Sequence, residues 1–181
     1  MTKKYILTGG PGVGKTSVIN ELREQGFYTN GEVADYLIKR GLETNSNLLP
    51  WKDRDGFQRA VLETQLRWEK EFAEDTEIAF LDRGVADGIA YYRIDGLEAP
   101  REITEAARNA KYEKVFLLEP IEAYENTKVR REDAETAKRI HCEIERAYRE
   151  LGYEIVRIPA EPIKQRVSRI LESIAAEPIN A

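Results

Sequence analysis

The 181-residue sequence contains a single cysteine, Cys142, and a single histidine, His141. One cysteine cannot form a disulfide within the chain, and together the two residues cannot supply the four ligands of a structural zinc site. A Ser/His/Asp or Cys/His catalytic triad would have to use His141. Because His141 lies beside the apolar stripe of a predicted helix, we expect it to be structural.

Long hydrophobic runs are also missing. No segment approaches the ~18 consecutive apolar residues of a membrane-spanning helix. The two lysines near the N-terminus are not followed by the long apolar run of a secretory signal. We therefore expect a cytoplasmic protein without a membrane span.

The sequence has no excess of positive charge, with 28 Lys and Arg against 33 Asp and Glu and a formal net charge of −5. Bulk nucleic-acid binding is therefore not expected. Hydrophobic residues make up 41% and charged residues 34%, a balance typical of a soluble globular protein. The length and the lack of a linker predict one domain over residues 1–181.

Apolar segments of strand length alternate with helical patterns along the chain, and several of the strands are apolar on both faces. This pattern indicates an α/β fold with a mostly parallel five-stranded sheet between two helical layers. Strands are predicted at residues 5–8, 27–29, 78–82, 115–118 and 153–158. Helices are predicted at residues 16–23, 32–39, 53–72, 86–93, 102–110, 133–151 and 163–174, and we expect Gly41 to end the second of them.

A glycine-rich loop follows the first predicted strand and opens the first helix. Residues 9–16 read GGPGVGKT, which fits the Walker A pattern G-x-x-x-x-G-K-[ST]. In such a loop the backbone N–H groups surround phosphates, the lysine reaches the β- and γ-phosphates, and the Thr hydroxyl binds Mg²⁺. We therefore predict that ATP or another NTP, with Mg²⁺, binds here. The predicted nucleotide-binding residues are Gly10, Pro11, Gly12, Val13, Gly14, Lys15, Thr16 and Ser17.

Two further candidates follow the third predicted strand. Asp82 is well placed to bind Mg²⁺ directly or through water, together with Thr16, although it could instead cap the helix that follows. Arg83 beside it is a candidate cation for the transferring phosphoryl group.

Three other charged residues are candidates for catalysis. Glu32, after the second strand, could orient or deprotonate an acceptor hydroxyl, or could serve only as a favourable helix N-terminal residue. Arg130 and Arg131 could belong to a small lid, near residues 120–134, that closes over ATP. Alternatively, they form a solvated basic turn that pairs with the neighbouring acidic residues.

Two other classes of P-loop protein fit the sequence poorly. The N-K-x-D motif of guanine-specific GTPases is absent, and the D-x-x-G match at residues 53–56 precedes a long helix instead of following a strand. Large mechanical ATPases of the AAA+ type need a lid domain and more chain than the 165 residues that follow Thr16. The size fits a small-molecule or nucleoside-type kinase, in which catalysis is positioning and charge neutralisation.

The combination of motifs resembles the NadR-type, or ribosylnicotinamide-kinase-like, family of P-loop ATPase and kinase domains. The resemblance covers nearly the whole chain and rests on ILTGGPGVGKT at 6–16, GEVA at 31–34, FLDRG at 80–84, VRRED at 129–133 and YRELGY at 148–153. It implies a three-layer α/β/α P-loop NTPase fold, a lid near Arg130, phosphate and metal roles for Lys15 and Thr16, and second-strand roles for Asp82 and Arg83. Where the family often has an arginine soon after the glutamate, this chain has Asp35, which argues against an acidic or phosphorylated acceptor.

These features favour a kinase that transfers the γ-phosphoryl group of ATP to a small hydroxyl-bearing acceptor such as a nucleoside or riboside. Two alternatives remain open. The domain could be a nucleotide-dependent switch that binds a protein or lipid partner, or an AAA-type ATPase domain that couples hydrolysis to a partner.

Overall fold

The computed structural model describes residues 2–71, 75–121 and 134–176 of the chain. The strands are β1 (Lys3–Thr8), β2 (Tyr28–Thr29), β3 (Ile78–Asp82), β4 (Lys114–Leu118) and β5 (Ile155–Ile158). The helices are α1 (Lys15–Glu24), α2 (Val33–Glu43), α3 (Arg54–Trp68), α4 (Ala86–Ile94), α5 (Arg101–Asn109), α6 (Ala134–Glu150) and α7 (Ile163–Ala175).

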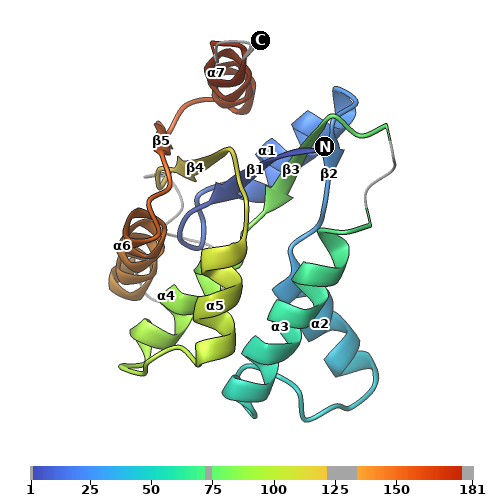
Figure 1. Cartoon of the computed structure of the whole chain (residues 1–181), viewed down its shortest axis with the longest axis vertical. Helices are drawn as coiled ribbons and strands as arrows, with labels where there is room; N and C mark the ends of the chain where they lie inside the picture. Colours follow the sequence, from blue (N-terminus) through green and yellow to red (C-terminus); the bar gives the residue numbers. More distant parts are fainter. Residues whose placement is uncertain (1, 72–74, 122–133, 177–181) are drawn as a thin grey trace.

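The five strands form one sheet in the order β2-β3-β1-β4-β5, and every pairing is parallel. Figure 1 shows α4, α5 and α6 on one side of the sheet, with α1 and α7 on the other. This is the predicted three-layer α/β/α arrangement. Because β1 is the central strand, the loop after it lies in the middle of the carboxyl edge of the sheet, where ligands of open α/β sheets bind.

The central strands are apolar on both faces because each face is covered by helices. Along β1, Ile6 packs with α4, α5 and α6, whereas Tyr5 and Leu7 pack with α1 and α7. Adjacent residues of β3 and β4 divide between the same two clusters, as do Phe80 and Leu81. Alternate residues of each strand face opposite sides of the sheet, but the sequence shows no alternation of polar and apolar residues, since the residues on both faces are hydrophobic.

The register of strand pairing sets where the candidate site residues lie along the direction of the strands. Leu7 of β1 lies opposite Asp82 of β3, so Asp82 ends its strand one residue below the level of Thr8. Thr29 of β2 lies opposite Phe80. β1 and β3 therefore end within one residue of each other, whereas β2 ends two residues before the level of Asp82. Asn30, the residue after β2, spans this difference by accepting a hydrogen bond from the Asp82 N–H.

Two details differ from or refine the expectations from sequence. The helix predicted to end at Gly41 continues to Glu43. Gly41 instead permits close packing against Leu49, because a Cβ atom at this position would lie 2.9 Å from a Leu49 methyl carbon. Asp53 caps α3 by accepting a hydrogen bond from the Gly56 N–H at 2.9 Å, so this D-x-x-G segment starts a helix.

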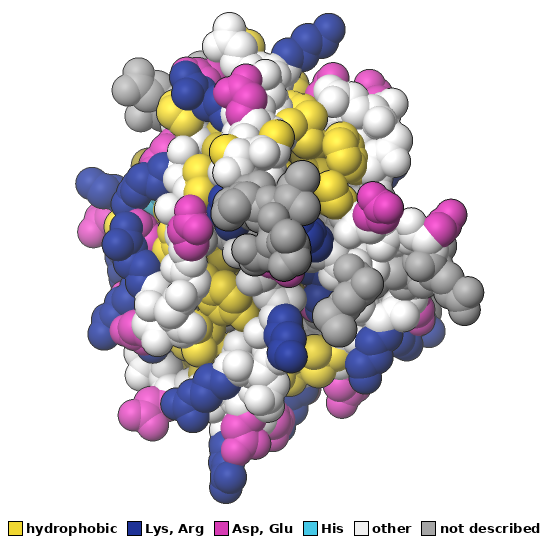
Figure 2. All heavy atoms as spheres, turned by 45° about the horizontal axis from the view of Figure 1, so that its top comes forward, with side chains coloured by type: hydrophobic (Ala, Val, Ile, Leu, Met, Phe, Trp, Pro, Cys, Tyr) yellow, Lys and Arg dark blue, Asp and Glu magenta, His cyan; other side chains and the backbone are white. Residues whose placement is uncertain are grey.

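The surface carries mixed charge. On the face drawn in Figure 2, lysines and arginines are interspersed with acidic side chains. Within the described ranges, no helix is long and apolar enough to cross a bilayer. Most of the predicted lid, including Arg130 and Arg131, lies outside the described residues.

Candidate functional site

The loop from Gly9 to Gly14 connects the end of β1 directly to the start of α1. Gly9, Gly12 and Gly14 have φ angles of 141°, 82° and 82°, a region that residues with a side chain rarely adopt. Gly14 is the N-cap of α1, and no side chain caps that helix. The free N–H groups of the first helical turn are therefore available to an anion, as the Walker A pattern predicts.

Lys15 is the first residue of α1 and is only 5% exposed. Burial lowers the pKa of its ammonium group, and the Arg83 guanidinium lowers it further. The carboxylates of Glu32, Asp82 and Asp87 act in the opposite direction. Two cations and three carboxylates therefore share this buried region, and a polyphosphate would add the negative charge that Lys15 and Arg83 attract.

Side chains of two helices that come much later in the sequence, α6 and α7, form hydrogen bonds with the backbone of the phosphate loop. The Gly10 N–H donates to Nδ1 of His141 on α6 at 3.2 Å. Arg166 of α7, which is 1% exposed, donates from Nη1 to the Val13 carbonyl at 2.5 Å and from Nη2 to the Glu119 carbonyl at 2.9 Å. These contacts orient the peptide groups of the loop before any ligand binds.

His141 thus has a structural role, as expected, and its role is specific to the phosphate loop. Because Nδ1 accepts the Gly10 hydrogen bond, the proton of the neutral ring lies on Nε2, 3.6 Å from the Glu119 carboxylate. Burial lowers the pKa of His141 and favours this neutral form, although the charge of Glu119 opposes that effect.

Asp82 is buried at the carboxyl end of β3, and its exposed fraction is 3%. Its backbone N–H donates to Oδ1 of Asn30 at 2.7 Å, which links it to the segment after β2. The side-chain Oδ1 atom of Asp82 is buried without a hydrogen-bond partner among the described residues. Burial raises the pKa of Asp82 to about 6, and the charges of Glu32 and Asp87 contribute to the increase.

An unpartnered buried carboxylate oxygen next to a threonine hydroxyl fits Mg²⁺, which binds one or two protein groups and otherwise uses phosphate oxygens and water. Asp82 and Thr16 line the same cavity. No group of three or more His, Cys, Asp or Glu side chains that could hold a metal occurs in the part of the chain described.

Arg83 has a left-handed backbone conformation, with φ at 71°, which is unusual for a residue with a long side chain. Its Nε atom donates to Oε1 of Glu32 at 3.1 Å, and its Nη1 atom donates to the Gly9 carbonyl at 3.3 Å. Burial lowers the pKa of the guanidinium, but Tyr91, Glu32 and Asp87 raise it well above its ordinary value. The structure therefore brings Glu32, Arg83 and the start of the phosphate loop together.

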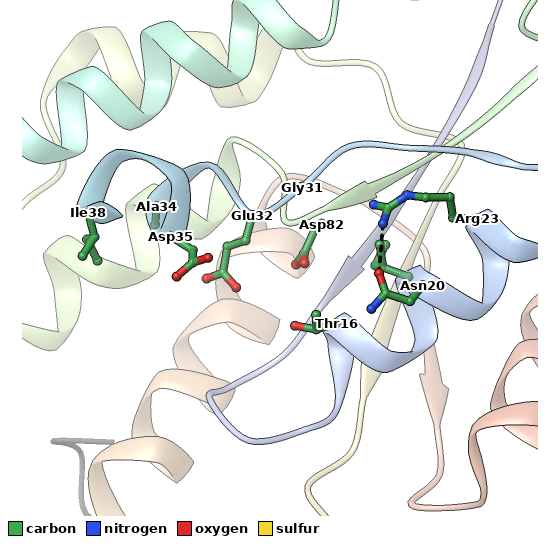
Figure 3. A pocket seen from close by; sticks show the side chains of 10 residues that line it. Thr16, Asn20, Arg23, Gly31, Glu32, Ala34, Asp35, Ile38 and Asp82 are labelled. Carbon is green, nitrogen blue, oxygen red and sulfur yellow. Dashed lines mark hydrogen bonds between the residues drawn. The ribbon is translucent and has the colours of Figure 1, made fainter. Parts of the chain in front are cut away.

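A cavity of about 460 Å³ opens beside these groups. Figure 3 shows that Thr16, Asn20 and Arg23 line it from α1, that Glu32 and Asp35 line it from the start of α2, and that Asp82 lies between them. The carboxylates of Glu32, Asp35 and Asp82 all point toward this space. Its volume suits a small organic molecule.

Several contacts within the site were not anticipated from sequence. Asp87 and Tyr148 bond to each other and lie behind Arg83, and the Gln65 side chain donates to the Arg83 carbonyl. The spacing of four residues between Arg83 and Asp87 at a helix start was the one available signal for that pair. No local pattern indicates Gln65, Tyr148 or Arg166, because their partners are 18, 61 and 153 residues away.

An all-parallel sheet with a glycine-rich phosphate loop after its central strand defines the P-loop NTPase fold. The model of a protein family described as an AAA domain matches residues 4–166, which is most of the chain. The chain therefore belongs to this AAA-domain family. No curated protein matches it.

Solved structures with the same fold include several kinases. A deoxyadenosine kinase from M. mycoides, with dCMP and dCDP bound, superposes with a TM-score of 0.68 at 14% identity, covering 96% of this chain and 98% of the kinase. Thymidylate kinase from Ehrlichia chaffeensis gives 0.66 at 15% identity over 96% of this chain and 98% of that one. A NadR protein in complex with NR gives 0.71 at 17% identity. The match covers 99% of this chain but only 54% of NadR, so the chain spans about half of that protein. At these identities the likeness concerns the fold.

Proposed function

We propose that this protein is a kinase that transfers the γ-phosphoryl group of ATP to a hydroxyl of a small acceptor such as a nucleoside or riboside, in the manner of NadR-type kinase domains. The observation that carries the proposal is the cavity between α1 and α2, which holds Glu32 and Asp82 at one end of the phosphate loop. A simple ATPase needs only water at this position, whereas the cavity has room for an organic acceptor.

The residues take the following roles. Lys15 and the backbone N–H groups of residues 12–17 hold the phosphates, and Thr16 and Asp82 hold Mg²⁺, which when bound neutralises charge on the phosphates. Arg83 stabilises the negative charge that develops on the transferring group. Glu32 accepts or orients the acceptor proton, and its ion pair with Arg83 holds the carboxylate in place.

The charges around the cavity support an acceptor without a phosphate group. Three lining side chains, Glu32, Asp35 and Asp82, are carboxylates, and Arg23 is the lining cation. Arg23 is held at the wall, because Nε donates to Thr29 at 2.8 Å and Nη1 to Asn20 at 2.9 Å. A phosphorylated acceptor would meet net repulsion here.

A coupled assay of ADP release tests the proposal. With MgATP present, nucleosides and ribosides, including ribosylnicotinamide, are screened for stimulation of ADP formation, and phosphorylated product is confirmed by mass spectrometry. Glu32→Gln should lower the stimulated rate roughly 100-fold or more, the contribution typical of a general base. Glu43→Gln at the other end of α2 is the matched control and should leave the rate unchanged.

Stimulation by no acceptor, together with unchanged turnover in Glu32→Gln, would overturn the kinase proposal. Tight nucleotide binding with slow hydrolysis, and a protein or lipid partner captured only with a non-hydrolysable analogue, would then favour a nucleotide-dependent switch.

A further inference from the structure

Asp87 is a buried carboxylate that the sequence analysis does not single out. It lies in the first turn of α4 and is 3% exposed. Its two oxygens accept four hydrogen bonds. Oδ1 accepts from Thr8 Oγ1 at 2.6 Å and from Arg83 Nη1 at 2.8 Å. Oδ2 accepts from the Gly84 N–H at 3.1 Å and from the Tyr148 hydroxyl at 2.7 Å.

The four donors come from three separate parts of the fold. Thr8 ends β1, Arg83 and Gly84 follow β3, and Tyr148 belongs to α6. Tyr148 is 0% exposed, and its hydroxyl donates to Asp87. Burial and the charge of Asp87 raise the pKa of Tyr148 well above its ordinary value, so the hydroxyl stays a donor. Asp87 therefore joins the central strand, the Arg83 turn and α6 at one point.

Arg83 is held in place by hydrogen bonds of both its backbone and its side chain, and Asp87 is one of the side-chain partners. Its left-handed conformation is held through the backbone, because its N–H donates to the Leu7 carbonyl at 3.0 Å and its carbonyl accepts from Gln65 at 3.0 Å. On the side chain, Glu32 takes Nε, whereas the Gly9 carbonyl and Asp87 share Nη1. Asp87 has the shorter of the two Nη1 contacts and carries a full charge, so it is the stronger restraint on that end of the guanidinium.

We propose that Asp87 and Tyr148 form a positioning pair, in which Tyr148 fixes the Asp87 carboxylate and Asp87 fixes the Arg83 guanidinium between Glu32 and the phosphate loop. Neither residue is assigned contact with substrate. The proposal deepens the function proposed above and rests on it for the role of Arg83 in phosphoryl transfer.

The chemistry of the site requires a carboxylate at position 87. All four neighbours are donors, so both oxygens must accept. In Asp87→Asn the amide nitrogen would face either Arg83 and Thr8, or Gly84 and Tyr148. One pair of buried donors would lose its acceptor, and Arg83 would lose the opposite charge beside it.

A matched pair of tyrosine variants tests the idea without altering packing. Tyr148→Phe removes only the hydroxyl that bonds Asp87. Tyr112→Phe is the control, because Tyr112 is also buried, also packs on Tyr153, and donates its hydroxyl to Glu69 at 2.8 Å instead. Tyr148→Phe loses one buried hydrogen bond to a carboxylate, whereas Tyr112→Phe loses its bond to Glu69 and also the one it accepts from the Val85 N–H at 3.1 Å. The control should therefore lose at least as much stability, so an effect on Arg83 that occurs only in Tyr148→Phe reports on the contact with Asp87.

The first readout is the side-chain Nη1–H NMR signal of Arg83, the group that donates to Asp87, assigned by its loss in Arg83→Lys. In the wild-type protein this hydrogen should exchange slowly with water. Exchange should be at least about tenfold faster in Tyr148→Phe and unchanged in Tyr112→Phe, which is the effect of weakening one charge-assisted hydrogen bond. Equal exchange rates in the two variants would overturn the positioning pair. Because this measurement needs no acceptor, it can be interpreted even if the proposed kinase activity fails.

The second readout is a double-mutant cycle on ADP release from MgATP. Asp87→Asn alone should lower kcat roughly 10- to 100-fold with a smaller change in KM for ATP. If Asp87 acts through Arg83, adding Asp87→Asn to Arg83→Lys should lower kcat by less than about twofold further. If the fold-reduction of kcat in the double variant equalled the product of the two single reductions, Asp87 would act independently of Arg83 and would only support the fold. Should Asp87→Asn fail to fold, Tyr148→Phe takes its place in the same cycle.

Discussion

The phosphate loop and the cavity beside it meet at Thr16, but they are held in different ways. The loop is shaped by its backbone, with three glycines at positive φ and with His141 and Arg166 bonded to its peptide groups. The cavity is shaped by side chains of α1 and α2, and several of these, such as Asp35, reach solvent. Changes at the loop should therefore affect nucleotide binding and stability together, whereas changes at the cavity should affect the choice of acceptor with little cost in stability.

The largest expected effect is at Lys15, where the loop meets the phosphates. Lys15→Ala should lower MgATP affinity or turnover by roughly 100-fold or more, because it removes the buried cation that we propose contacts the phosphates. Isothermal titration calorimetry and ADP release measure the two quantities. Lys164→Ala on the surface of α7 should change neither. Undiminished affinity and turnover in Lys15→Ala would refute the assignment of the nucleotide site.

Asp82→Asn should separate activity from stability. In the metal-free protein the pKa of Asp82 is about 6, above its ordinary value near 4 in an unfolded chain. Between these values the folded state holds a proton that the unfolded state does not, so stability falls as pH rises from about 4 to about 6. At pH 7 the asparagine variant should be more stable by up to about 3 kcal/mol, and it should lose Mg²⁺-dependent turnover.

Urea unfolding at pH 4 and pH 7 without Mg²⁺ checks this prediction. The wild-type protein should lose more stability than Asp82→Asn between the two pH values. A surface change, Asp75→Asn, serves as the control. If the free energy of unfolding changed equally with pH in the wild-type protein and in Asp82→Asn, the raised pKa of Asp82 would be contradicted.

Arg166 tests the support beneath the loop. Arg166→Met leaves the buried carbonyls of Val13 and Glu119 without their donor and should lower the free energy of unfolding by about 1–3 kcal/mol. MgATP affinity should fall with it. Arg169→Met on the same helix removes an exposed ion pair with Glu161 and should cost less than about 1 kcal/mol. Equal losses in the two variants would mean that Arg166 does not support the loop.

The smallest effect is expected at Asp35, on the acceptor side. Asp35→Asn should change the free energy of unfolding by less than about 0.5 kcal/mol, because its ion pair with Lys39 is exposed. The variant should accept a phosphorylated analogue of the acceptor about two- to fivefold better, since one repelling charge is gone. Lys39→Gln breaks the same ion pair without altering the lining of the cavity. If this control accepted the phosphorylated analogue equally well, the gain would come from loss of the ion pair on α2 and not from the charge in the cavity.

The parts of the site that sequence could indicate are those encoded within a few residues. The loop at residues 9–16, Asp82 at the end of an apolar strand, and the sheet itself follow from local patterns. The contacts of His141, Arg166 and Tyr148 do not, because they depend on how α6 and α7 pack against β1 and on residues far apart in the chain. The close packing of Gly41 against Leu49 was missed for a similar reason, since Leu49 belongs to the segment after the helix and no pattern around Gly41 indicates it.

Gly10 shows how one small residue couples distant parts of this sequence. A Cβ atom at position 10 would lie 2.8 Å from the Ala137 carbonyl and 3.1 Å from the His141 Cβ, so the missing side chain is what lets α6 lie directly on the loop. The Walker A pattern leaves this position unrestricted. Among relatives, a residue other than glycine at position 10 should therefore accompany changes at positions 137 and 141. Co-variation of these three positions would distinguish chains built like this one from the many other proteins that carry the same motif.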